Sequence, residues 1–250
     1  HQLGAKITSI DKDGFPPLKI EGKIIDKNKV TLKANISSQY ISALLLIGAK
    51  LKKGLELTLV GEITSIPYIK MTVGFLNSLG VATTFNENTI KVQHHSKISR
   101  QKITIESDWS SASYFYSIVA LSTIGTKISL KSFYNDSLQG DSILAEIYRQ
   151  FGVETIYDDK AITLIKADSK LFPINLDLIN APDIAQTIAI SCFGLGIACT
   201  LSGLHTLKIK ETDRLVALKT EIEKLGGQVQ ISEHSLHLSS SKSIKKNINI

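Results

Sequence analysis

The sequence is poor in cysteine and has no long apolar run. Its 250 residues include only two cysteines, Cys192 and Cys199, which lie in one apolar segment. Two thiols in this arrangement provide neither a disulfide framework nor a metal-binding spacing, and buried free thiols are typical of a reducing compartment. No segment reaches the roughly 18 consecutive apolar residues of a membrane-spanning helix. We therefore predict no structural disulfide and no membrane segment.

Several motifs of common enzyme classes are also missing. The chain has no Walker phosphate loop, no GxGxxG turn, and no Cys/His or Ser/His pair of the nucleophilic kind. His94 with His95, and His234 with His237, have odd spacings on expected strands. Their side chains should point to opposite faces, which argues against a metal site. We expect neither a metal nor a cofactor.

The charge balance is moderately basic, with 29 Lys and Arg against 23 Asp and Glu and a net charge of +6. Positive charge favours anionic partners in general, although a lysine-rich surface also serves solubility. The lysines are scattered without interleaved aromatic residues, so no nucleic-acid partner is indicated. A hydrophobic content of 43% is that of an ordinary globular protein of one large or two modest domains.

A threefold internal repeat is the most informative feature of the chain. Ser37, Ser110 and Asp183, called the slot residues here, each open an apolar run and follow one another at intervals of 73 residues. A large apolar residue followed by glycine closes each copy, at Leu79-Gly80, Phe151-Gly152 and Leu225-Gly226. A different polar insert lies between these landmarks in each copy, at residues 65–68, 139–141 and 210–214. Such periodicity indicates an architecture built from one supersecondary unit.

Each copy has the pattern helix, strand, helix, strand, strand. In the second copy we expect a helix over 110–124 capped by Ser110, a strand over 126–130, a helix over 142–151, and a hairpin of 153–157 and 161–165. The helices expected in the other two copies cover residues 40–47, 68–79, 184–195 and 215–225. The strands expected there cover residues 55–60, 82–85, 89–93, 228–231 and 236–238.

One more strand before each copy, at residues 29–35, 103–106 and 174–178, completes a βαβαββ unit. The fold class is therefore α/β (α+β). The first helix of each unit is apolar nearly all round, whereas the second is amphipathic. We expect the first helix to be enclosed by sheets and the second to lie outside.

Two polar tips of the first copy each allow two interpretations. Ser37-Ser38-Gln39 stands at a helix start, where first-turn amides and hydroxyls form an anion site, but serine is also an ordinary helix cap. In the insert at 65–68, Ser65 suits a cap and Pro67 the first turn. Tyr68 either presents its ring and hydroxyl to a ligand or packs as a plain aromatic residue.

The third insert, Lys210-Glu211-Thr212-Asp213-Arg214, places four charges in five residues before an amphipathic helix. Thr212 or Asp213 would cap that helix and leave Lys210 and Glu211 in the loop. A solvated charge run is one interpretation, and a binding site at the position of the other inserts is the alternative. Asp183, which heads an apolar helix, is either a cap or a site residue. Hydroxyls, cations and two carboxylates together suit phosphate binding and proton transfer.

Four of these segments together resemble 5-enolpyruvylshikimate-3-phosphate synthase, in that family's order and with similar spacing. The resemblance covers essentially the whole chain. The segments are Ser37-Ser38-Gln39-Tyr40-Ile41-Ser42-Ala43-Leu44-Leu45, Asp108-Trp109-Ser110-Ser111-Ala112-Ser113-Tyr114-Phe115, Pro182-Asp183 and Lys210-Glu211-Thr212-Asp213-Arg214-Leu215.

The resemblance implies an enzyme that transfers the enolpyruvyl group of phosphoenolpyruvate to the 5-hydroxyl of shikimate 3-phosphate and releases phosphate. It implies an inside-out α/β fold of two domains, each of three βαβαββ units, around a cleft. Residues 1–106, with one complete unit at 29–93, would belong to one domain, and residues 107–250, with two units, to the other. The full-length enzyme would be a cytoplasmic bacterial monomer of the shikimate pathway and a glyphosate target.

The resemblance also implies roles for the residues of the first copy. Ser37, Ser38 and Ser65 would hold the phosphate of shikimate 3-phosphate. Gln39 and Tyr68 would flank its ring.

The residues of the third copy would carry the chemistry. Asp183 would bind the substrate hydroxyls and serve in proton transfer at the attacking oxygen, and Lys210 would reach the same substrate. Glu211 would handle the proton on the methylene carbon. Arg214 would bind the carboxylate or phosphate of phosphoenolpyruvate, to which its planar fork is suited.

The chain departs from the family pattern in several places. Thr206, a further substrate-contact position, stands where relatives often have Asn, and Trp109 stands where Ala is usual, as a packing change. The family's early Lys-Ser loop, its Asn-Ala-Gly-Thr loop and its late Asp-His-Arg motif have no match here. With His1 in place of an initiator methionine and an alternation like an unfinished strand at the end, we expect a central fragment that is inactive alone.

Three other interpretations remain. A UDP-N-acetylglucosamine enolpyruvyl transferase shares the architecture but lacks the Ser-Ser-Gln and Lys-Glu-Thr-Asp-Arg motifs. An RNA terminal phosphate cyclase is built on related repeats but requires a nucleophilic His near the C-terminus. A non-catalytic structural fragment is the third. The insert Gln139-Gly140-Asp141 acquires no role and is expected to be structural.

Overall fold

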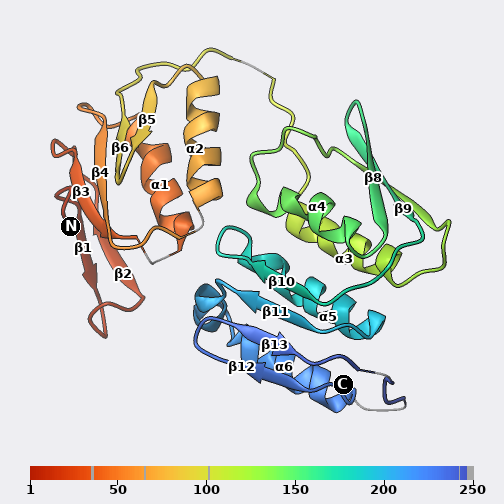
Figure 1. Ribbon diagram of the computed structural model, residues 1–250. Helices are drawn as coiled ribbons and strands as arrows, with labels where there is room; N and C mark the ends of the chain where they lie inside the picture. Colours follow the sequence, from red (N-terminus) through yellow and green to blue (C-terminus); the bar gives the residue numbers. More distant parts are fainter. Residues whose placement is uncertain (35–36, 65, 101, 242, 247–250) are drawn as a thin grey trace. The chain divides into compact units, whose positions relative to one another are not determined.

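The chain forms two compact units, His1–Lys102 and Ile103–Ile250, which are described separately below. The structure is a computed structural model that describes residues 1–34, 37–64, 66–100, 102–241 and 243–246 (Figure 1). Among these residues, no helix is both long and apolar enough to cross a membrane.

The first unit contains one complete copy of the repeat. A four-stranded sheet has the order β3-β4-β6-β5, in which β3 is parallel to β4 and the other pairs are antiparallel. Its strands are β3 (Lys29–Lys33), β4 (Leu55–Val60), β5 (Thr83–Asn86) and β6 (Thr89–Val92). Its helices are α1 (Ser38–Gly48) and α2 (Ile66–Ser78). A separate two-stranded hairpin consists of β1 (Lys6–Ser9) and β2 (Leu18–Glu21).

The core of this unit lies between one face of the sheet and one face of each helix. Leu57 at the centre of β4 is fully buried and stands opposite Ile90 of β6 in the register. From the helices, Ile41 and Leu45 of α1 and Ile69 of α2 reach the same core. Burying a side chain of this size contributes about 1.5–3 kcal/mol, so the apolar spacing of the two helices specifies which faces pack.

The second unit contains two copies of the repeat. The second copy is made of α3 (Trp109–Ala120), β7 (Lys127–Lys131), the 3-10 turn η1 (Gly140–Ile143), α4 (Leu144–Arg149), β8 (Val153–Asp158) and β9 (Ala161–Lys166). The third copy is made of β10 (Ile174–Asp177), η2 (Pro182–Ile184), α5 (Ala185–Leu195), β11 (Cys199–Ser202), η3 (His205–Ile209), α6 (Arg214–Lys224), β12 (Val229–Ile231) and β13 (Leu236–Leu238).

The sheets confirm the repeated topology for two of the three copies. The sheet of the third copy has the order β10-β11-β13-β12, with β10 parallel to β11, as in the first copy. The sheet of the second copy has only the three strands β7-β9-β8. The strand predicted at residues 103–106 is therefore wrong: these residues form no strand. Ile103 and Ile105 are both exposed, and Glu106 is held by its side chain instead.

Two helices also differ from their predicted bounds. Asp108, rather than Ser110, caps α3 through hydrogen bonds from Ser110 N and Ser111 Oγ, since the helix begins at Trp109 and Ser110 is already its second residue. That helix ends at Ala120, short of the predicted residue 124. The segment predicted as one helix over 142–151 begins as the 3-10 turn η1 and is helical only over Leu144–Arg149.

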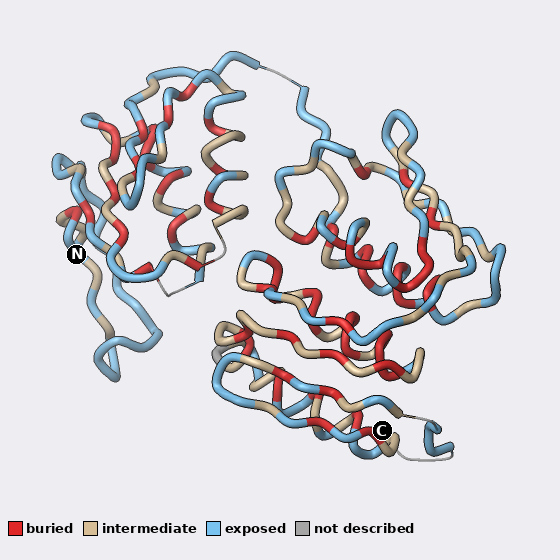
Figure 2. Tube along the Cα trace, in the orientation of Figure 1, coloured by how far each residue is buried: buried red, intermediate tan, exposed pale blue. Residues whose placement is uncertain are grey.

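The first helices of the three copies differ in how far they are enclosed. Figure 2 shows buried residues along much of α5, and seven of its residues are buried. In contrast, Leu46 and Ile47 of α1 and Phe115 and Ile118 of α3 are exposed. The predicted enclosure by sheets is not seen in this form: α5 packs mainly on the helix α3, with α6 and the strand β11 also in contact, whereas α1 and α3 each keep exposed apolar residues within their own unit.

A buried polar triangle ties the helices of the second unit together. The Tyr148 hydroxyl of α4 bonds Ser191 Oγ of α5 at 2.9 Å, and Ser191 Oγ donates to Ser117 Oγ of α3 at 2.8 Å. Burial raises the pKa of Tyr148 to about 12, so this hydroxyl stays protonated in the ordinary pH range. Hydrogen bonds thereby add directional contacts to the largely apolar packing of these three helices.

Candidate active site

The Ser37-Ser38-Gln39 segment lies at the start of α1, in the first unit. Ser37 is the helix cap, and its hydroxyl oxygen accepts a hydrogen bond from Gln39 N at 3.3 Å. Ser37 and Gln39 are exposed and Ser38 is half-buried. The remaining first-turn amides and two hydroxyls are thus available to an anion, so capping and binding are compatible.

The first insert leads into α2. Ser65 lies outside the described residues, while Tyr68 is half-buried in the first turn of the helix. The Ser42 hydroxyl of α1 and the Thr72 hydroxyl of α2 are 2.7 Å apart, and Thr72 Oγ1 also donates to Tyr68 O at 3.1 Å. These bonds hold the start of α2, and with it Tyr68, to α1.

Asp183 lies in η2, the turn between β10 and α5. Gly203, after β11, adopts a φ of +75°, and a Cβ atom there would lie 2.4 Å from Ile179 N and 2.5 Å from Asp177 Oδ1. Asp177 Oδ1 in turn accepts a hydrogen bond from Ile179 N at 3.0 Å. The close approach that glycine permits therefore fixes the turn that leads to Asp183. The Asp183 side chain makes no capping bond to α5, which leaves it free to pair with other side chains.

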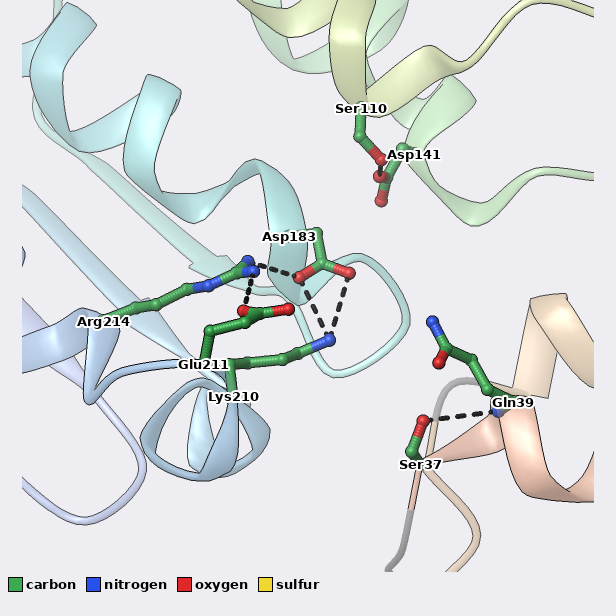
Figure 3. Close-up of polar contacts among 8 residues, drawn as sticks. All are labelled: Ser37, Gln39, Ser110, Asp141, Asp183, Lys210, Glu211 and Arg214. Carbon is green, nitrogen blue, oxygen red and sulfur yellow. Dashed lines mark hydrogen bonds and ion pairs between the residues drawn. The ribbon is translucent and has the colours of Figure 1, made fainter.

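The charged insert and Asp183 form one cluster within the third copy (Figure 3). Asp183 Oδ1 lies 3.3 Å from Lys210 Nζ and 3.0 Å from Arg214 Nη1. Arg214 Nη2 lies 2.7 Å from Glu211 Oε2. Asp213 caps α6 and accepts hydrogen bonds from Leu215 N and Val216 N, which confirms one of the two predicted caps. The structure thus brings together four of the residues predicted for the site.

The acids and cations of the cluster are paired in a partly buried environment. The side chains of Asp183, Lys210 and Arg214 are all partly buried, at 28–29% exposure, so solvent screens their attraction less than on an open surface. A hydrogen bond from its own backbone amide, with one from the Arg214 guanidinium, holds the pKa of Glu211 below its ordinary value. Two cations beside a partly buried carboxylate can bind an anionic ligand next to a group that accepts a proton.

Thr206 lies in η3, close in sequence to the insert. Its side-chain oxygen is buried and, among the described residues, has no hydrogen-bond partner. The hydroxyl therefore faces the protein interior rather than solvent.

A polar network around the middle insert was not anticipated from the sequence. Glu106 Oε1 accepts from Trp109 Nε1 at 2.8 Å, and Glu106 Oε2 accepts from Ser137 Oγ at 2.8 Å and from Gln139 Nε2 at 3.1 Å. Ser110 Oγ donates to the buried Asp141 carboxylate. The equal spacing of Ser110 and Asp183 in the repeat could have indicated the contact between Ser110 and Asp141. Each of the two slot residues contacts the polar insert of its own copy.

Metal ligation finds no support in the part of the chain that the structure describes. Within those residues, no group of three or more His, Cys, Asp or Glu could hold an ion.

Comparison with known proteins gives the family. The family model described as EPSP synthase (3-phosphoshikimate 1-carboxyvinyltransferase) matches residues 1–248. The chain belongs to the EPSP synthase family. A protein of Bacteroides fragilis strain YCH46 named 3-phosphoshikimate 1-carboxyvinyltransferase is 44% identical over 225 residues, which are 90% of this chain and 55% of that protein. One of the same name from Haemophilus influenzae strain PittEE is 33% identical over 240 residues, 95% of this chain and 54% of that protein.

The structural comparison gives the same fold. EPSP synthase from Acinetobacter baumannii superimposes with a TM-score of 0.75 at 21% identity, over 97% of this chain and 55% of that one. The predicted inside-out α/β fold of the EPSP synthase family is thereby confirmed. The chain spans about half the length of the curated relatives that it matches.

Proposed function

We propose that the whole EPSP synthase family protein to which this sequence belongs transfers the enolpyruvyl group of phosphoenolpyruvate to the 5-hydroxyl of shikimate 3-phosphate. The observation that carries the proposal is the cluster of Asp183, Lys210, Glu211 and Arg214. It combines two carboxylates with two cations in one partly buried place. Family membership over residues 1–248 supports the same reaction. We also propose a cytoplasmic location, without a metal or cofactor.

The reaction requires proton transfers at two atoms. The 5-hydroxyl oxygen attacks C2 of phosphoenolpyruvate while its proton passes to a base, and the methylene carbon C3 gains a proton. In the second stage C3 loses a proton, the C2–C3 double bond re-forms, and phosphate leaves. Asp183 would accept the proton of the hydroxyl, and Glu211 would donate and later recover the proton at C3. Lys210 and Arg214 would offset the charge of the substrate anions.

The first unit would bind the other end of shikimate 3-phosphate. Ser37 and Ser38, with Ser65, would donate hydrogen bonds to its phosphate, as helix starts commonly do. Gln39 and Tyr68 would lie against the ring of shikimate 3-phosphate. The boundary between the two domains of the whole protein is proposed near Glu106.

The test is Asp183→Asn in the whole protein. The substitution keeps the shape of the side chain but removes its basicity, so we expect kcat to fall about 10²–10⁴-fold. Phosphate release with shikimate 3-phosphate and phosphoenolpyruvate measures it. Asp159→Asn, in the exposed turn between β8 and β9, is the matched control and should keep the original rate. Transfer by the Asp183 variant within tenfold of the original protein would contradict the proposed role.

A further inference from the structure

The middle insert, Gln139-Gly140-Asp141, has no place in the proposed reaction, yet it holds a buried acid. Asp141 has none of its surface exposed, and its Oδ2 accepts a hydrogen bond from Ser110 Oγ. Burying a carboxylate is costly unless it is bonded, so an apolar side chain would stabilise this position more simply. The presence of an acid here calls for a role other than filling space.

The repeat shows what this junction corresponds to. In the third copy, the slot residue Asp183 pairs with Lys210 and Arg214 of its own insert. In the second copy, the slot residue Ser110 pairs with Asp141 of its own insert. The same two parts of the unit therefore meet in both copies. In the second copy the contact is a hydrogen bond from a serine hydroxyl to a carboxylate.

The helix α3, which contains Ser110, packs on both η1 and η2, the turn that carries Asp183. On another side, Asn180 and Ala181 border a cavity of about 400 Å³ that Gly140 of η1 also lines. Asn180, which precedes η2, is exposed, and η2 has no side-chain cap. The contact of α3 with η2 is therefore one of the supports that hold Asp183, beside the turn fixed at Gly203.

Gln139 also bonds the start of α3. Its Oε1 accepts from Trp109 N at 3.0 Å, and its Nε2 donates to Ser107 O at 2.8 Å. The first turn of α3 is thus bonded to both ends of the insert: to Gln139 through Trp109, and to Asp141 through Ser110. Two side-chain bonds from one insert to one helix turn leave little freedom to either.

We propose that Asp141 is a positioning residue for Asp183: through its bond to Ser110 it holds α3 and η1 as the support on which η2 rests. Asp141 touches no reacting atom. It sets the direction of the Asp183 carboxylate, and with it the pairing to Lys210 and Arg214. The catalytic consequence rests on the proposed function, but the structural coupling does not.

The first experiment uses the 250-residue chain and needs no activity. Asp141→Asn should shift the amide resonances of Asp183 and Ile184 and the guanidinium signals of Arg214 in ¹H–¹⁵N spectra. Ser110→Ala, a milder change, should shift the same signals, and the double variant should add little to either. Tyr148→Phe removes a buried hydroxyl from the same helix bundle and controls for general loosening; it should leave these signals in place. Unchanged Asp183 and Arg214 signals in Ser110→Ala would overturn the proposal.

The second experiment measures kinetics in the whole protein. Asp141→Asn should lower kcat about 10–100-fold, as a small misplacement of a catalytic group does, and leave KM for phosphoenolpyruvate nearly unchanged. An equal loss in Tyr148→Phe would show a merely structural effect and overturn the proposal. Absence of any transfer in the original protein would contradict the proposed function instead, while the spectra still decide whether Asp141 positions Asp183.

Discussion

Arg214 is held between two carboxylates: its Nη1 lies 3.0 Å from Asp183 Oδ1 and its Nη2 lies 2.7 Å from Glu211 Oε2. The guanidinium thereby uses two of its donors on the protein's own acids. A guanidinium has five N–H donors, so an anionic ligand at Arg214 has donors left to bind but shares the positive charge with these two carboxylates.

The pairing predicts how Glu211 titrates. Arg214→Gln removes the positive charge and the hydrogen bond from its side chain, so the pKa of Glu211 should rise toward its ordinary value of 4.5. The pKa is lowered in the folded chain, so the pair's contribution to stability is present above that ordinary value and is lost as the pH falls through the folded pKa. Carbon-detected NMR titration of the glutamate carboxyl measures the shift.

A second ion pair on the same helix provides the control. Lys224 Nζ lies 2.7 Å from Glu221 Oε1, near the end of α6 and away from the cluster. Lys224→Gln should leave the titration of Glu211 unchanged. A Glu211 that titrates identically in the Arg214 variant and the original chain would show that its own backbone amide alone sets the pKa.

Alanine substitutions at Gly203 and Gly125 distinguish the cost of backbone strain from the cost of a steric clash. Both have a positive φ, of +75° and +90°, but a Cβ at Gly203 would meet backbone at 2.4 Å, whereas at Gly125 nothing lies within 4 Å. Gly125→Ala should cost about 1 kcal/mol of unfolding free energy. Gly203→Ala should cost more, about 2–4 kcal/mol, because the Asp177–Ile179 turn must also move.

Urea unfolding followed by circular dichroism measures both variants. The Gly203 variant should also disturb the amide signals of η2, since the displaced turn leads to Asp183. Equal loss of stability in the two variants would mean that the turn yields to the added methyl group without resistance.

The cysteine pair gives a prediction on reactivity. Cys192 and Cys199 are buried and unpaired by disulfide. A hydrogen bond with Cys199, followed by burial, raises the pKa of the Cys192 thiol well above its ordinary range, so little reactive thiolate forms. At about pH 8 the folded chain should react slowly with an aromatic disulfide reagent, and both thiols should react at once in urea. Rapid labelling without urea would show that α5 opens readily from β11.

The sequence predicts the helices and strands of this fold better than the long-range contacts that these elements make. The strands at 55–60 and 236–238 occur at the predicted bounds, because alternating apolar residues specify a buried face of a strand locally. The strand at residues 103–106 does not form, although its pattern alternates equally well. A strand also requires a partner for its backbone, and a single pattern cannot specify which edge is available. Instead, four donors converge on the Glu106 carboxylate, which no local pattern reveals.

The site shows the same division between local and long-range information. Asp213 as a cap and Lys210 in the loop follow from helix-start chemistry. The meeting of Asp183 with Arg214 links residues 31 apart and was implied only by the family motifs. The bond between Ser110 and Asp141 links residues equally far apart and was not predicted at all. The spacing of the repeat could have suggested that Ser110 contacts the middle insert. Which residue of the insert it bonds depends on how the side chains pack between α3 and η1.

The last prediction concerns the chain by itself, which we expect not to catalyse the transfer. Three family motifs that supply cationic substrate contacts have no match in these 250 residues. Charge-assisted hydrogen bonds contribute about 1.5–3 kcal/mol each, so four missing contacts remove about 6–12 kcal/mol, against about 8 kcal/mol for a micromolar complex. Phosphate release by the purified chain, assayed with both substrates, should equal the background rate. Turnover above background that Asp183→Asn abolishes would show that the cluster functions without those contacts.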